Sequence, residues 1–176
     1  MSFKDQIIRV SKKMFNRSDV TSKLFKFFVS ISLYKFDNTE HQNHFTSRLV
    51  IVDGRYSSIE ITTIEAMLIS NPLLQSVPIG QEINDCDDFA LQVKSSITSL
   101  VRQRAVQQHA TLFPPAVGIL LTPRHALNII ICHQDNDPTN FGVFLLDAMK
   151  PGKGLISSPK EAKELMLQPE ISLIYI

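Results

Sequence analysis

Cysteine is scarce in this sequence of 176 residues, which contains only Cys86 and Cys132. Two cysteines are too few for the disulfide framework that holds small secreted modules together. Nothing at the N-terminus resembles a secretory signal, which needs a basic start, an apolar core and a cleavage site. We therefore expect a protein of a reducing compartment, with the cytoplasm as the default.

An excess of charge and a long hydrophobic run are also missing. The 18 Lys and Arg residues nearly balance the 17 Asp and Glu residues, so the formal net charge is +1. Such a chain has no overall field to attract nucleic acid or an acidic membrane. The longest apolar runs, at 116–121 and 127–132, are far shorter than the roughly 20 residues of a membrane span. We expect no stable membrane insertion and no nucleic-acid partner, and substrate choice must come from a local site.

The chain shows neither an internal repeat nor a low-complexity tract. Its length, with 44% hydrophobic and 20% charged residues, fits a single globular domain over residues 1–176. Within it we distinguish an N-terminal helical region, 1–45, from a core of the candidate chemistry, 80–150.

The first half of the chain is predicted to be mainly helical. Basic residues and an apolar stripe at helical spacing predict an amphipathic helix over 1–17, and dense apolar residues predict a buried helix over 21–36. The first helix either packs in the ordinary way or docks a partner. A short strand at 48–52 follows, and then a helix that begins near Thr62 and ends before Pro72.

The second half changes from a helix to strands. A long helical pattern begins at or just after Cys86, and β-type runs follow at 116–121, 126–133, 142–147 and 171–175. These patterns predict an α+β fold in which the helix that bears Cys86 packs on an antiparallel sheet.

Cys86 has the surroundings of a candidate nucleophile. At a helix start, free backbone N–H groups and the positive end of the helix dipole stabilise a thiolate. The neighbouring aspartates, among them Asp87 and Asp88, oppose that charge. The thiolate would therefore also need a cationic partner, and an imidazolium is the usual one.

His125, which opens the strand 126–133, is the best candidate for this partner. Strand alternation places His125 with Leu127 on one face and Asn128 with Cys132 on the other. Cys132 is then a small buried apolar side chain. Asp147 closes an apolar run, where its charge must be paired, and it is our candidate for the residue that orients the imidazole. Asn128 is a second candidate only if the strand is irregular.

The ordered segments Cys86-Asp87-Asp88-Phe89-Ala90, His125-Ala126-Leu127-Asn128 and Leu146-Asp147 resemble the papain-like and transglutaminase-like cysteine peptidase superfamily. The pattern is similar to that of bacterial transglutaminase-like cysteine peptidases and of the peptidase domain of a fungal agglutinin. The resemblance covers roughly residues 80–150.

This resemblance implies a Cys86, His125 and Asp147 triad that cleaves or transfers the acyl group of a peptide or amide substrate. It also implies an oxyanion-hole side chain shortly before the cysteine, for which Gln81 is the nearest match, beside the Cys86 N–H. Asp88 fits a supporting position next to the site. Arg124 departs from the pattern, because these families often have Gly before the histidine, and this change would narrow access to the imidazole.

Two other hypotheses fit the sequence. A metal-dependent protein could use His41, His44, His125 and His133 with the aspartates, although no Cys or HExxH pattern completes a site. A catalytically inactive papain-like domain could serve as an interaction module through its basic N-terminal helix. We predict no metal or cofactor. Some superfamily members use calcium as an activator, but the sequence shows no compact calcium ligand set, so that question stays open.

Overall fold

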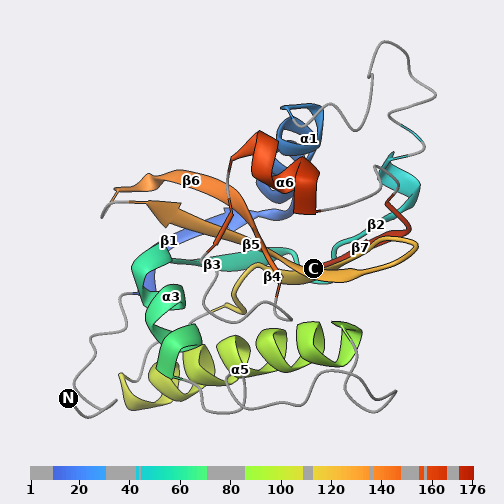
Figure 1. The fold of residues 1–176 in the computed structure, drawn as a ribbon. Helices are drawn as coiled ribbons and strands as arrows, with labels where there is room; N and C mark the ends of the chain where they lie inside the picture. Colours follow the sequence, from blue (N-terminus) through green and yellow to red (C-terminus); the bar gives the residue numbers. More distant parts are fainter. Residues whose placement is uncertain are drawn as a thin grey trace.

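The computed structural model of the chain describes residues 10–30, 43, 45–70, 86–108, 113–134, 137–147, 155–156, 158–165 and 171–176. It contains both helices and strands, so the predicted α+β class is confirmed (Figure 1). None of the helices in these ranges is long and apolar enough to cross a membrane.

A five-stranded sheet forms the centre of the fold. Its strands, in spatial order, are β2 (Leu49–Val50), β7 (Leu173–Tyr175), β4 (Val117–Leu121), β5 (Ala126–Gln134) and β6 (Asp137–Leu146). Neighbours from β7 to β6 pair antiparallel, whereas β2 pairs parallel with β7. The sheet is therefore mixed, and our expectation of a purely antiparallel sheet is wrong at its β2 edge.

Helices cover both faces of this sheet (Figure 1). Helices α1 (Arg17–Ser30) and α6 (Pro159–Leu165) lie on one face, where Leu24 and Ala162 share a core with Leu127 and Ile129. Helices α3 (Ile61–Ser70) and α5 (Cys86–Gln107) lie on the other, where their apolar residues share a core with Ile130. The alternation of β5 sends successive side chains to these two cores.

The N-terminal segment corrects one prediction. Val10–Asn16 forms strand β1, which pairs antiparallel with β3 (Arg55–Ile59) in a separate two-stranded sheet. The helix predicted over 1–17 is therefore wrong for this part, and residues 1–9 lie outside the described ranges. Met14, on the predicted apolar stripe, is exposed, while Phe15 is buried against Tyr56. The apolar residues of this segment have helical spacing, but its pairing with β3, which is distant in the sequence, makes it a strand.

The helix predicted over 21–36 is present and begins earlier, at Arg17. Asn16 and Asp19 exchange hydrogen bonds at this start: the Asp19 N–H donates to Asn16 Oδ1 at 3.0 Å, and the Asn16 N–H donates to Asp19 Oδ2 at 2.9 Å. This reciprocal cap satisfies N–H groups that a helix start leaves free. Residues 31–42 lie outside the described ranges.

The remaining elements follow the predicted pattern closely. Helix α3 begins one residue before Thr62, and the strand predictions at 48–52, 116–121, 126–133, 142–147 and 171–175 each match a strand. Strand β6 begins at Asp137, five residues before the strand predicted over 142–147. Strand β3 and helix α6 were not predicted.

Candidate active site

Cys86 is the first residue of α5, as the sequence predicted, and is partly exposed. The apolar face of this helix, which includes Val93, Ile97 and Val101, packs on the central sheet and fixes where the thiol lies. The backbone N–H of Ala126 donates a hydrogen bond to Cys86 Sγ at 3.2 Å. A donor at this distance stabilises negative charge on sulfur. The start of α5 thus meets the start of β5.

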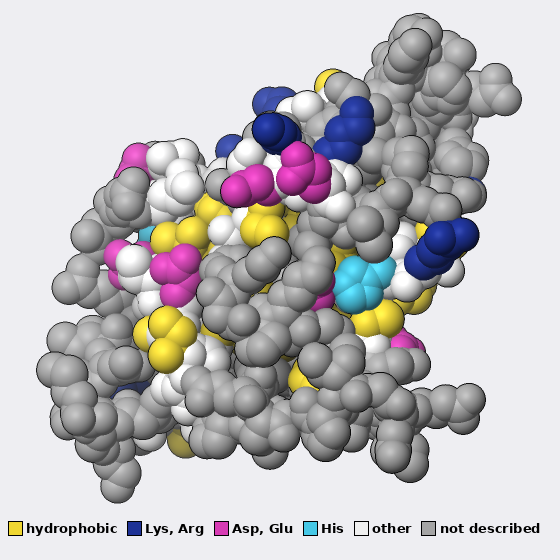
Figure 2. Space-filling model, viewed as in Figure 1, with side chains coloured by type: hydrophobic (Ala, Val, Ile, Leu, Met, Phe, Trp, Pro, Cys, Tyr) yellow, Lys and Arg dark blue, Asp and Glu magenta, His cyan; other side chains and the backbone are white. Residues whose placement is uncertain are grey.

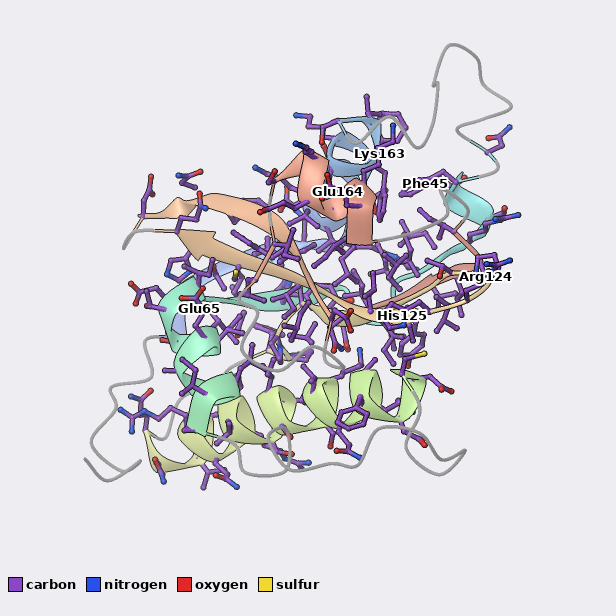
Figure 3. The ribbon with its side chains drawn as sticks, viewed as in Figure 1. Phe45, Glu65, Arg124, His125, Lys163 and Glu164 are labelled. Carbon is purple, nitrogen blue, oxygen red and sulfur yellow. The ribbon has the colours of Figure 1, made fainter. Side chains whose placement is uncertain are left out.

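His125 directly precedes the residue that makes this contact, in the tight turn between β4 and β5. Thr122 holds the turn: its Oγ1 accepts the His125 N–H at 3.0 Å, and its N–H donates to the His125 carbonyl oxygen at 2.9 Å. Pro123 and Arg124 occupy the two central positions and are exposed. The turn therefore presents His125 at the end of the sheet, where Figure 3 labels it beside Arg124.

Asp147 contacts the imidazole of His125. His125 Nε2 lies 3.2 Å from Asp147 Oδ1, and the two side chains are 17% and 1% exposed. A buried carboxylate beside Nε2 fixes the orientation of the ring and favours a proton on that nitrogen. The predicted pair of His125 and Asp147 is present in the structure.

The register of the sheet explains why these two residues meet. Asn128 lies opposite Leu146 in the antiparallel pair of β5 and β6. Because the strands run in opposite directions, the residue before Asn128, Leu127, lies opposite the residue after Leu146, Asp147. His125 is two residues before Leu127 and is a diagonal neighbour of Asp147 on the same face. Diagonal neighbours of this kind are within reach of each other's side chains.

Asn128 does not orient the imidazole. Its side chain is fully buried, and Nδ2 donates to the carbonyl oxygens of Ala90 at 2.8 Å and Gly118 at 3.2 Å. These bonds tie the first turns of α5 to strands β4 and β5. Asn128 therefore supports the site by holding the helix that carries Cys86 against the sheet, and the alternative of an imidazole contact is wrong.

Gln81 and Asp88 were also predicted as supporting residues. Gln81 lies outside the described ranges. Asp88 lies in the first turn of α5, two residues after Cys86, and is partly exposed, whereas Asp87 is exposed. Arg124 is exposed beside His125, and Figure 3 shows its side chain at the end of the same hairpin.

The second thiol and the second described histidine lie away from this site. Cys132 is buried, and its burial raises the pKa of the thiol, so it stays protonated. His133 is buried next to it, with Nδ1 at 2.7 Å from Ser58 Oγ, and burial lowers the pKa of this imidazole. His125 and His133 lie at opposite ends of β5 and cannot share one metal ion. Within the described ranges, His, Cys, Asp and Glu residues form no group of three that could hold a metal.

Two contributors to this geometry were not predicted from the sequence. The Ala126 N–H contacts the sulfur through the backbone, so residue identity carried no signal for it. The role of Thr122 had a weak signal, because a Thr-Pro pair between two apolar runs is typical of a turn whose hydroxyl bonds the backbone.

No protein-family model and no curated protein matches the chain. Among solved structures, one described as "PSL1a-E64 complex" is similar, with a TM-score of 0.60 and 16% sequence identity. The match covers 93% of this chain and 50% of that one, so the chain spans about half the length of the solved structure. At this identity the similarity shows a shared fold.

Proposed function

We propose that this chain is a cysteine-dependent enzyme that hydrolyses or transfers the acyl group of a peptide or amide, and that its fold is papain-like or transglutaminase-like. The observation that carries the proposal is the 3.2 Å hydrogen bond from the Ala126 N–H to Cys86 Sγ. This bond puts the thiol of Cys86 next to the peptide group that links His125 to Ala126. His125 is in turn paired with the buried carboxylate of Asp147. Nucleophile, base and orienting group then lie together in chain order.

In the proposed reaction, His125 takes the proton of Cys86, and the thiolate attacks the substrate carbonyl carbon. A C–S bond forms, the carbonyl C–N bond breaks, and the imidazolium returns the proton to the leaving amine. The products of this half-reaction are a free amine and a thioester on Cys86. Water then releases a carboxylic acid, or a second amine releases a new amide, and both routes regenerate the thiol.

Each side chain has one role in this scheme. Asp147 holds the proton on Nε2 of His125, which leaves Nδ1 as the basic nitrogen. The N–H groups at the start of α5, including that of Cys86, provide donors for the oxyanion that develops on the carbonyl oxygen. Asn128 maintains the position of the helix through its bonds to the carbonyl oxygens of Ala90 and Gly118.

The solved structure with the shared fold is described as a complex with E64, and this makes E64 a suitable probe for the present chain. We expect intact-mass analysis to show one E64 adduct, located on Cys86 by peptide mapping. Cys86→Ser removes the adduct, and His125→Ala slows its formation by at least about 100-fold. The matched control is His133→Gln, which changes a histidine at the far end of β5 and leaves the labelling rate unchanged. Labelling of Cys132, or equal labelling of wild type and His125→Ala, would contradict the proposal.

A further inference from the structure

Arg124 is an exposed arginine next to the candidate active site. It lies in the turn between β4 and β5, one residue before His125. Consecutive Cα atoms are about 3.8 Å apart, so its backbone is directly beside that of the histidine. Figure 3 labels both residues at the same end of the sheet, and Figure 2 shows Lys or Arg side chains and an exposed histidine in this region of the surface. The guanidinium can therefore contact a molecule that is bound at the thiol.

The donors of Arg124 are not used by the protein. Within the described part of the chain, its guanidinium makes neither a hydrogen bond nor an ion pair. Two other arginines of the same surface differ, because Arg17 donates to the Ile51 carbonyl oxygen and Arg48 donates to the Ile171 carbonyl oxygen. An arginine stays charged and carries five N–H donors. Arg124 can therefore offer a full positive charge and all of its donors to an anion.

The turn holds the backbone of Arg124 in a fixed relation to the imidazole. Three hydrogen bonds join Thr122 and His125: the Thr122 N–H and hydroxyl both donate to the His125 carbonyl oxygen at 2.9 Å, and Thr122 Oγ1 accepts the His125 N–H at 3.0 Å. Pro123, at the first central position, has a restricted φ and stiffens the turn further. Only the side chain of Arg124 has to become ordered when it binds a partner, which lowers the entropic cost of binding.

Acidic residues lie on the other side of the thiol. Asp87 and Asp88 follow Cys86 in the first turn of α5. Their charges repel a carboxylate that approaches over the helix start. Arg124 belongs to the hairpin, on the side from which the Ala126 N–H contacts Cys86 Sγ. A carboxylate on a substrate is therefore disfavoured above the helix and favoured beside the hairpin.

The proposed reaction decides which part of a substrate passes the hairpin. The imidazolium of His125 returns its proton to the leaving amine, so that amine must lie against the ring. The chain on the amine side of the attacked bond then continues past His125 toward its neighbour Arg124. An extended peptide advances about 3.3 Å per residue. The first or second residue beyond the attacked bond is thus within reach of the arginine side chain.

We propose that Arg124 binds a carboxylate on the leaving fragment of the substrate, one or two residues beyond the attacked bond. The carboxylate belongs to an acidic side chain or to a free C-terminus, because both present the same group to a guanidinium. Such pairs are charge-assisted and can be bidentate. The inference rests on the proposed function and adds the substrate class. Arg124 is then a specificity-determining residue that takes no part in the proton transfers.

Three N-iodoacetyl dipeptides test this proposal, because the amide nitrogen next to their reactive carbon takes the place of the leaving amine. N-Iodoacetyl-Ala-Gln amide is neutral, N-iodoacetyl-Ala-Glu amide adds a side-chain carboxylate, and N-iodoacetyl-Ala-Gln with a free C-terminus adds an α-carboxylate. In each case the thiolate forms a C–S bond and iodide leaves. Each rate is divided by the rate with iodoacetamide. At low ionic strength we expect at least one carboxylate reagent to react with wild type about fivefold faster than the neutral one, the upper end for an exposed ion pair.

The reagent that gains the advantage identifies the source of the carboxylate. Arg124→Gln should remove the advantage, whereas Arg124→Lys should keep part of it, because an ammonium retains the charge without the bidentate geometry. The matched control is Arg102→Gln, which removes the same charge from an exposed arginine near the other end of α5. This control should keep the full advantage.

Equal rates with all three reagents in wild type would overturn the inference. So would an advantage that persists in Arg124→Gln, or one that Arg102→Gln loses to the same extent. In each of these cases fast iodoacetamide labelling of Cys86 would leave the proposed function intact. A Cys86 that iodoacetamide labels no faster than free cysteine would overturn both.

Discussion

His125 and Asp147 are diagonal neighbours on adjacent strands, with Nε2 of the imidazole 3.2 Å from Oδ1 of the carboxylate. The aspartate is almost completely buried, whereas the histidine is partly exposed at the end of the sheet. A carboxylate in this position orients the ring through Nε2, and Nδ1 is then the nitrogen that the proposed mechanism uses as the base. The relationship depends on register alone, since a shift of one residue would turn Asp147 to the opposite face.

Asp147→Asn should therefore slow E64 labelling of Cys86 by about 100-fold or more, because an amide can present an N–H to the ring and stabilise the wrong tautomer. The folded structure should persist, as checked by circular dichroism. Asp137→Asn, at the exposed start of β6, is the control and should label at the wild-type rate. If both variants are labelled at the same rate, Asp147 does not take part in the proposed reaction.

Asn128→Ala should lower the free energy of unfolding by about 1–3 kcal/mol, measured by urea denaturation. The carbonyl oxygens of Ala90 and Gly118 each lose one buried hydrogen bond, and a typical intramolecular hydrogen bond contributes roughly 0.5–1.5 kcal/mol. Asn140→Ala, on an exposed position of β6, should change stability by less than about 0.5 kcal/mol. A loss of stability below about 1 kcal/mol in Asn128→Ala would contradict the role of Asn128 in holding the helix.

Gly118→Ala tests the close packing of β4 against the C-terminal strand. A Cβ at this position would lie 2.4 Å from the Tyr175 carbonyl oxygen and 2.5 Å from Ile176 Cγ1. We expect a destabilisation of about 3 kcal/mol, because the backbone oxygen cannot move independently of β7. Gly54→Ala, where nothing lies within 4 Å of the added carbon, should be nearly neutral. Similar melting temperatures for the two variants would show that the strands are packed less closely than described.

His133 should make the fold less stable in mild acid. Burial lowers the pKa of its imidazole in the folded state, while the charges of Glu60 and Asp137 oppose the shift. The unfolded chain takes up a proton near pH 6.5, and the folded chain does so only at a lower pH, so the free energy of unfolding falls as pH decreases through this window. Above about pH 7 the imidazole is neutral in both states and the effect disappears.

Denaturation curves between pH 5 and 8 check this prediction. His133→Gln, which keeps a polar group next to Ser58 Oγ, should flatten the pH dependence relative to wild type. An unchanged slope in the variant would assign the pH dependence to other groups.

The sequence was most informative where local patterns and tertiary packing agree. The helix after Cys86 and the strands before and after His125 have strong periodicity. Strand alternation alone predicted that the side chains of His125 and Cys132 lie on opposite faces of the sheet. Asp147 was predicted because a charge at the end of a core strand needs a partner. These residues carry their own signal, so their arrangement was accessible without a structure.

Register and long-range pairing were not accessible in this way. Val10–Asn16 has a helical spacing but joins β3 across some forty residues of chain, and no local pattern encodes that contact. Likewise, alternation turned Asn128 away from His125, but only the register with β4 and the position of α5 reveal the two carbonyl oxygens that it binds.

The central claim is best tested by the rate at which iodoacetamide alkylates Cys86, followed by mass spectrometry at pH 6.0–9.0 in wild type and His125→Ala. Cys132 is an internal control, because burial raises the pKa of its thiol and it should react only when the chain unfolds. The account predicts that Cys86 reacts at least tenfold faster than free cysteine at pH 6.5, and that His125→Ala removes this advantage. Cys86 labelling as slow as that of Cys132, or unaffected by loss of His125, would contradict it.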